Sequence, residues 1–265
     1  MGDRCGRLPL ATTGHLRRAA REVPEASESD HLSFPAPTRR GSRPRLAVAE
    51  LSRTSPQAPE SWRAVRAIIF DIGRVIVSVN LKRALTTLGG GANLSPERVW
   101  TTIETDPRWR EWQEGRIEPR EWHKHLARRL KSTHTFEQFC AAWNSALDLE
   151  PILGEDLFQQ LARRHRLVLL SNTDPIHVAY LEANFRFPRY FAARVYSCAV
   201  GACKPDAVIY RRAIVEARAA PEQVLYIDDA REYVEAGLQA GMQAHLFESA
   251  EHLLDMFRRQ GHLEG

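Results

Sequence analysis

The sequence has few cysteines and no long apolar run, and both absences exclude classes of protein. Its 265 residues include 4 cysteines, none of them in a CxxC pair, which is too few for a disulfide framework. The apolar run Ala67–Phe70 is stopped by Asp71, far short of the roughly 18 residues that a membrane span needs. We therefore expect a protein of the reducing cytoplasm with no membrane partner.

Net charge is also low, since 37 lysines and arginines face 33 acidic residues for a formal charge of +4. Such a small excess does not by itself indicate a nucleic-acid-binding protein. The excess is concentrated in residues 1–66, which hold twelve arginines, no lysine and seven acidic residues. Nucleic-acid binding through this segment would rest on composition alone, so we do not expect a nucleic-acid partner.

Residues 1–65 are predicted to form a disordered tail rich in arginine and proline. Seven of the chain's 15 prolines lie there, without a sustained helical or strand period. Such a segment buries too little apolar surface to offset its conformational entropy. A targeting peptide is an alternative, but the segment lacks the apolar core of a secretory signal and is more acidic than a transit peptide. A further alternative is that translation starts at Val65.

From Ala67 onward, short apolar runs alternate with helical patterns. Each run is bounded by polar residues, as is typical of strands buried on both faces of a parallel sheet. The runs cover residues 67–71, 166–172, 224–229 and 244–247. The alternation predicts an α/β fold with a doubly wound parallel sheet. Polar residues just past the strand ends meet in one crevice of such a sheet. Those residues are Asp71, Ser171, Asp228 and Asp229.

Between residues 81 and 150 the sequence predicts helices and no comparable strand. The predicted helices cover Pro96–Thr105, Trp109–Glu114, Pro119–Leu130 and Phe136–Leu147. Five of the 6 tryptophans lie in this stretch, either to pack a small helical bundle or, alternatively, to line a ligand pocket. We predict that residues 66–80 and 151–265 form the α/β core and that residues 81–150 form a helical cap over the strand ends.

Four short motifs follow one another along the predicted core. They are Phe70-Asp71-Ile72-Gly73, Ser171-Asn172-Thr173, Lys204-Pro205-Asp206 and Tyr226-Ile227-Asp228-Asp229. Each is weak alone, but four in this order resemble the haloacid dehalogenase-like hydrolases. The FDxGxV form of the first motif (residues 70–75) and the cap sequence Glu114-Gly115-Arg116-Ile117 are similar to a sugar-phosphate phosphatase subgroup, in particular the α-D-glucose-1-phosphate phosphatase type.

The resemblance implies phosphate chemistry at the predicted strand ends. Asp71 would attack phosphorus and form an aspartyl-phosphate, which splits hydrolysis into two easier steps. Lys204 would hold the phosphate and stabilise the charge on its oxygens in the transition state. The hydroxyl of Ser171 and the backbone N–H of Asn172 would bind the other phosphate oxygens.

The same resemblance implies Mg²⁺ as the cofactor. The carboxylate nucleophile and the phosphate are both anions, and a divalent cation between them supplies the missing attraction. Asp228 and Asp229 offer the hard oxygen ligands that Mg²⁺ prefers, beside Asp71. In the family, the backbone carbonyl two residues after the nucleophile also binds the metal, which here implies Gly73. A lone aspartate after a strand is more often a turn or cap residue, so these roles depend on the four motifs together.

Gly73 is also where the chain departs from most phosphatases of the family. Those enzymes carry a second aspartate there, which protonates the leaving oxygen, and such acid–base help is typically worth about 10²–10⁴-fold. The resembled subgroup shares the glycine. Either a good leaving group or a cap residue would have to compensate. The candidate cap residues are Glu114, His123 and His125.

These observations favour a Mg²⁺-dependent phosphatase acting on a small phosphorylated metabolite, with a sugar phosphate preferred. One alternative is a metal-independent haloacid dehalogenase, but such relatives lack the tandem acid Asp228-Asp229. Another is a catalytically weak or inactive binding or regulatory protein, which Gly73, Arg74 and Ala230 would support. Arg74 would either add positive charge near the phosphate or face solvent. The substrate's identity and the oligomeric state do not follow from the sequence.

Overall fold

The computed structural model describes residues 64–90 and 93–263, so the prediction of a disordered tail lies almost wholly outside the described residues. None of the helices in these ranges is long and apolar enough to cross a membrane. The elements are β1 (Ala67–Phe70), β2 (Val77–Val79), α1 (Leu81–Gly90), α2 (Pro96–Glu104), α3 (Trp109–Gln113), α4 (Pro119–Leu130), α5 (Phe136–Asn144), β3 (Leu147–Pro151), α6 (Glu155–Leu161), β4 (Arg166–Ser171), α7 (Pro175–Asn184), the 3₁₀ helix Phe187–Tyr190, β5 (Ala193–Tyr196), α8 (Ser197–Val200), α9 (Ala207–Ala217), the 3₁₀ helix Pro221–Gln223, β6 (Val224–Asp228), α10 (Arg231–Gln239), β7 (Gln243–Leu246) and α11 (Ala250–Arg259).

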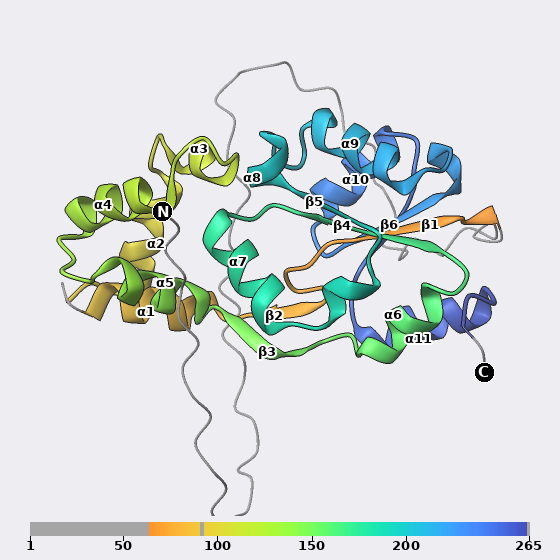
Figure 1. The fold of residues 1–265 in the computed structure, drawn as a ribbon, viewed down its shortest axis with the longest axis horizontal. Coiled ribbons are helices and arrows are strands. Elements are labelled where there is room, and N and C mark those ends of the chain that lie inside the picture. The colour runs from red at the N-terminus through yellow and green to blue at the C-terminus, as the bar shows by residue number, and fades with distance from the viewer. Residues whose placement is uncertain (1–63, 91–92, 264–265) are drawn as a thin grey trace, which may run out of the picture. The chain divides into compact units, whose positions relative to one another are not determined.

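A five-stranded sheet in the order β5-β4-β1-β6-β7 forms the centre of the fold (Figure 1). Every neighbouring pair in it is parallel. The strands β4 and β5 lie on one side of β1, and β6 and β7 lie on the other, so the strand order reverses at β1. In doubly wound sheets, ligands bind outside the carboxyl ends of the strands at such a switch point. The predicted α/β fold with a parallel sheet is confirmed.

Alternate side chains of β1 enter the two hydrophobic layers on either side of the sheet. Ile68 and Phe70 join the layer that contains residues of α6 and α11. Ala67 and Ile69 join the layer that contains residues of α9. All four side chains are fully buried, which explains why β1 appears as a continuous apolar run rather than an alternating one.

The helices α1 to α5 bury a separate hydrophobic cluster that includes Trp112, Trp122 and Trp143. Trp112 stacks on Trp122 with 5.6 Å between ring centroids. The tryptophans of this region therefore pack against one another, as the simpler of the two interpretations predicted. We keep the word cap for residues 81–150, and the exact division between cap and core stays a prediction.

Two elements near the cap boundaries differ from the sequence prediction. The predicted helix that should reach Leu147 ends at Asn144, and Leu147–Pro151 forms β3, which pairs antiparallel with β2. The helix α1 (Leu81–Gly90) was also not predicted. The strand β3 has only a short partner and leaves Leu149 61% exposed, so it lacks the buried pattern by which the longer strands are recognised.

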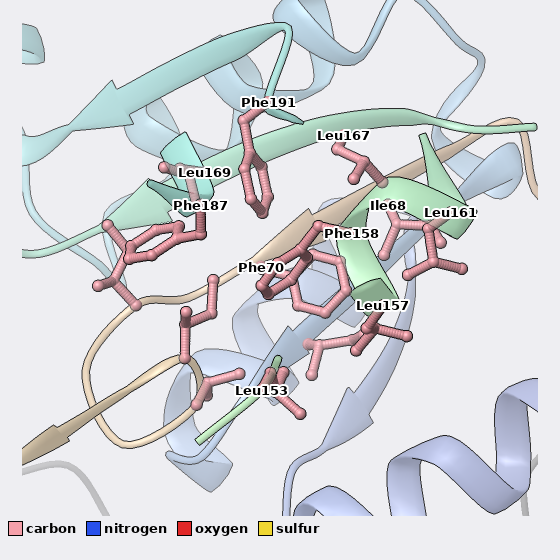
Figure 2. Close-up of a cluster of buried hydrophobic side chains, with 14 of the residues drawn as sticks. Ile68, Phe70, Leu153, Leu157, Phe158, Leu161, Leu167, Leu169, Phe187 and Phe191 are labelled. Carbon is pink, nitrogen blue, oxygen red and sulfur yellow. The ribbon is translucent and has the colours of Figure 1, made fainter. Parts of the chain in front are cut away.

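Phe158 packs among Phe70, Phe187 and Phe191 in the hydrophobic layer that contains α6 and α11 (Figure 2). Its ring centroid is 5.5 Å from that of Phe70 and 5.1 Å from that of Phe191. We predict that Phe158→Ala lowers the free energy of unfolding by about 3–5 kcal/mol, because it removes buried apolar surface and leaves a cavity. Urea unfolding followed by circular dichroism measures this. A loss below about 1 kcal/mol would contradict the prediction, since it would mean that the site collapses around the smaller side chain.

Candidate active site at the carboxyl ends of the strands

Asp71 stands directly after β1, at the switch point of the sheet. Its backbone N–H donates to the carbonyl of Ile227 on β6, at 2.9 Å, which fixes the start of the loop. The neighbouring strands end in Ser171 on one side and Asp228 on the other. The parallel register thus gathers residues that lie far apart in the sequence, as predicted from the polar strand ends.

Lys204 is buried between two of these carboxylates. Its Nζ lies 2.8 Å from Asp71 Oδ1 and 2.6 Å from Asp228 Oδ2, and the residue is only 4% exposed. Burial opposes the charged form of the amine, but the charges of Asp228 and Asp71 outweigh it and hold the pKa of Lys204 well above its usual range. The lysine is therefore a fixed positive charge beside the predicted nucleophile.

Asn172 holds the backbone of Lys204 in place. The Asn172 side chain accepts a hydrogen bond from the Lys204 N–H at 2.7 Å and donates one to the Lys204 carbonyl at 3.0 Å. The ring of Tyr233 lies 4.8 Å from the lysine Nζ and adds a cation–π contact. Sequence reasoning assigned Asn172 only a backbone role and did not identify Tyr233, which lies outside the four motifs.

Asp71, Asp228 and Asp229 bring carboxylate oxygens within 4.8 Å of one another. Burial raises the pKa of Asp71 to about 7, helped by the charges of Asp228 and Asp229 and opposed by Lys204. Burial likewise raises the pKa of Asp229. Crowded carboxylates that resist ionisation are suited to a hard divalent cation such as Mg²⁺, which favours their charged forms. Within residues 64–90 and 93–263, these three aspartates are the cluster whose geometry could hold a metal ion.

Besides its place in the acidic cluster, Asp228 accepts hydrogen bonds through both of its carboxylate oxygens. Oδ1 accepts the backbone N–H of Ala230 at 2.8 Å, and Oδ2 accepts the hydroxyl of Tyr226 as well as the lysine ammonium. The Tyr226 ring packs so closely on Gly237 of α10 that a Cβ at residue 237 would lie 2.6 Å from it. Asp228 therefore orients Lys204. The hydroxyl of Tyr226 in turn holds Asp228, and the Tyr226 ring packs against Gly237.

Gly73 and Arg74 lie at the rim of the site. A Cβ at Gly73 would meet only Val79 Cγ2, at 3.5 Å, so the backbone leaves room for a side chain there. Arg74 adopts the left-handed conformation, with φ of 60°. Its side chain is 65% exposed, yet its Nε lies 3.0 Å from Asp229 Oδ2. The side chain therefore faces solvent, as one of the two expectations had it, and its charge pairs with Asp229; a role near the phosphate stays a prediction.

The cap residues considered as proton donors each have other partners. Glu114 is buried and ion-paired, and the two histidines hydrogen-bond within the cap. The partners are Arg110 and Arg116 for Glu114, the carbonyl of His134 for His123, and Asp106 for His125. Each of the three side chains is thus held by a partner within the cap.

The chain is similar to a known family and to known proteins in sequence and in structure. A family model for haloacid dehalogenase (HAD)-like hydrolases matches residues 51–241. D-ribitol-5-phosphate phosphatase of Bacteroides thetaiotaomicron is 21% identical over 185 residues, covering 68% of this chain and 90% of that protein. A HAD family enzyme of the same organism, solved with magnesium and inorganic phosphate, is 23% identical with a TM-score of 0.66, covering 73% of this chain and 100% of that chain. A predicted HAD-like hydrolase from Porphyromonas gingivalis is 24% identical with a TM-score of 0.62, covering 74% and 97%.

The acidic cluster predicts that Mg²⁺ stabilises the protein more at high pH than at low pH. The pKa of Asp71 is raised from 3.8 to about 7. Its contribution to stability is therefore fully present below about pH 4 and is lost as pH rises through 7. Bound Mg²⁺ offsets this loss, and at 100 times its Kd it would add about 2.7 kcal/mol. We expect a larger Mg²⁺-induced rise in Tm at pH 8 than at pH 5.5, measured by calorimetry.

Asp229→Asn is the control for this experiment, because it keeps the side-chain volume but removes one negative charge. We expect a smaller Mg²⁺-induced shift in this variant at pH 8. An equal shift at both pH values, or the same shift in wild type and Asp229→Asn, would contradict a metal site at this cluster.

Proposed function

Because the chain belongs to the haloacid dehalogenase-like hydrolase family, as its four motifs predicted, we propose that it is a Mg²⁺-dependent phosphatase of a small phosphorylated metabolite. A sugar or polyol phosphate is the preferred substrate class, in line with the polyol-phosphate phosphatase to which the chain is similar. The observation that carries the proposal is the buried Lys204 beside Asp71, with three carboxylates converging next to it.

In the proposed reaction, a carboxylate oxygen of Asp71 attacks phosphorus, and the ester oxygen leaves with the electron pair of the broken P–O bond. Water then attacks the phosphorus of the aspartyl-phosphate, the bond from phosphorus to the Asp71 oxygen breaks, and inorganic phosphate leaves while the free carboxylate is restored. Lys204 is held in place before substrate arrives, so its charge stabilises the phosphate oxygens without reorganisation. Ser171, buried at the end of β4, would add a hydroxyl donor to the same oxygens.

Bound Mg²⁺ would offset the mutual repulsion of the carboxylates and the phosphate. Asp71 and Asp229 would hold it, together with Asp228 and the backbone carbonyl of Gly73. This donor set argues against the dehalogenase alternative, because attack on carbon by a carboxylate needs no cation and Asp229 would then have no metal ion to hold. Sequence reasoning reached the same preference from Asp228-Asp229 alone.

We predict that the full chain releases phosphate from sugar and polyol phosphates with Mg²⁺ and not with EDTA. Asp71→Asn should reduce release to background, because an amide cannot replace the nucleophile. Lys204→Met should lower kcat by roughly 10²–10³-fold, the cost of removing a preorganised charge. Malachite green detection of free phosphate measures all three. No release above the Asp71→Asn background from folded, Mg²⁺-binding protein would instead favour a binding or regulatory role.

The missing acid at Gly73 gives a second, sharper prediction. The position has room for a Cβ, so Gly73→Asp should be tolerated. A carboxyl group there would protonate a poor leaving group, and general acid catalysis is typically worth about 10²–10⁴-fold. We expect kcat to rise toward alkyl phosphates, with little change for p-nitrophenyl phosphate, whose leaving group needs no proton. Equal effects on both esters would show that proton supply to the leaving group does not limit the wild-type reaction.

A further inference from the structure

Two consecutive residues, Thr173 and Asp174, take part in the hydrogen bonds that join the cap to the core. These residues follow directly after Ser171 and Asn172, the proposed phosphate-binding pair. Trp143, near the end of α5, bonds directly to Asp174, whereas Gln113, the last residue of α3, is linked to Thr173 through the hydroxyl of Ser197. The attachment of the cap is thus built into the segment that leads out of the phosphate-binding site.

The first junction is centred on the Asp174 carboxylate, which is 4% exposed. Its Oδ1 caps α7 by accepting the backbone N–H groups of Ile176 at 2.9 Å and His177 at 3.1 Å. Its Oδ2 accepts the indole N–H of Trp143, from the cap helix α5, at 2.9 Å. One side chain therefore fixes both the start of α7 and the position of α5.

His177 completes this junction from the first turn of α7. Its Nδ1 lies 3.1 Å from Asp174 Oδ2, and its Nε2 lies 3.1 Å from the carbonyl of Trp143. Because both ring nitrogens face acceptors, only the imidazolium form satisfies both contacts. The ring also stacks on the Trp143 indole, with centroids 5.4 Å apart. The result is a buried ion pair that spans the cap–core boundary.

The second junction runs through the buried hydroxyl of Ser197. It accepts the backbone N–H of Thr173 at 2.9 Å and lies 2.8 Å from the carbonyl of Gln113 in the cap. Beside it, Gly115 has a φ of +68°, and a Cβ there would lie 2.0 Å from the carbonyl oxygen of Cys198. The cap loop that contains Gly115 therefore packs directly against the backbone of α8.

We propose that Asp174 is a positioning residue through which the cap sets the geometry of the phosphate-binding segment. The path has few steps: Trp143 of the cap orients Asp174, the backbone continues to Asn172, and Asn172 clamps Lys204. A displaced cap would therefore shift the proposed phosphate-binding residues as well as any contacts it makes to the substrate. This inference rests on the proposed function for its kinetic consequence but not for its structural one.

The test compares Trp143→Phe with Trp112→Phe in the full chain. Both tryptophans are buried in the cap, but the Trp112 indole nitrogen has no hydrogen-bond partner among the described residues. Both variants thus lose similar ring volume, and only Trp143→Phe loses the bond to Asp174. In Trp143→Phe we expect amide hydrogen exchange over residues 171–177 to quicken about tenfold, the effect of losing one charge-assisted hydrogen bond. In Trp112→Phe we expect no change there.

Steady-state kinetics on a sugar phosphate supply the second readout. Trp143→Phe should lower kcat about tenfold with a smaller change in KM, whereas Trp112→Phe should leave both near wild type. His177→Gln should resemble Trp143→Phe in both measurements. Unchanged exchange over residues 171–177 in Trp143→Phe, or equal changes in both tryptophan variants, overturns the proposal. If wild type lacks phosphatase activity, the proposed function fails, and the exchange experiment still decides the role of Asp174.

Discussion

The site depends on one buried ammonium group that is shared by two carboxylates. Lys204, Asp71 and Asp228 come from the loop before α9 and from the ends of β1 and β6, so they meet only when the sheet is complete. Charges buried in this way are tolerated because each has a partner, and removing Lys204, the partner of both carboxylates, would typically cost about 3–5 kcal/mol. The site is therefore complete only when the strands of the sheet are paired.

The charge balance around this lysine explains why a cation belongs there. Asp71, Asp228 and Asp229 carry three potential negative charges, whereas Lys204 and Arg74 supply two positive ones. An arriving phosphate would meet a net negative site. The pKa of Asp71 is raised first by burial and then by the neighbouring charges of Asp228 and Asp229. The imbalance lies at the carboxyl ends of β1 and β6, where Asp71, Asp228 and Asp229 meet.

The sequence was most informative where burial is complete. β1, β4 and β6 are continuous apolar runs, and each ends in a polar residue of a motif, so both the strands and their meeting point could be predicted. β3 and β5 lie at sheet edges and carry mixed side chains such as Leu149 and Arg194, whose pattern does not separate strand from loop. The clamp of Asn172 on Lys204 and the bond of Trp143 to Asp174 join residues 32 and 31 positions apart, and no local pattern marks such pairs.

The close packing of Tyr226 on Gly237 links the site to the outer helix α10. The tyrosine hydroxyl reaches Asp228 only because the helix presents no Cβ at the point of contact. Among homologous sequences, the two positions should consequently change together: a larger residue at 237 would accompany a smaller one at 226, and with it a different partner for Asp228. The residues at these two positions across related sequences would then show how the support of Lys204 has changed during divergence.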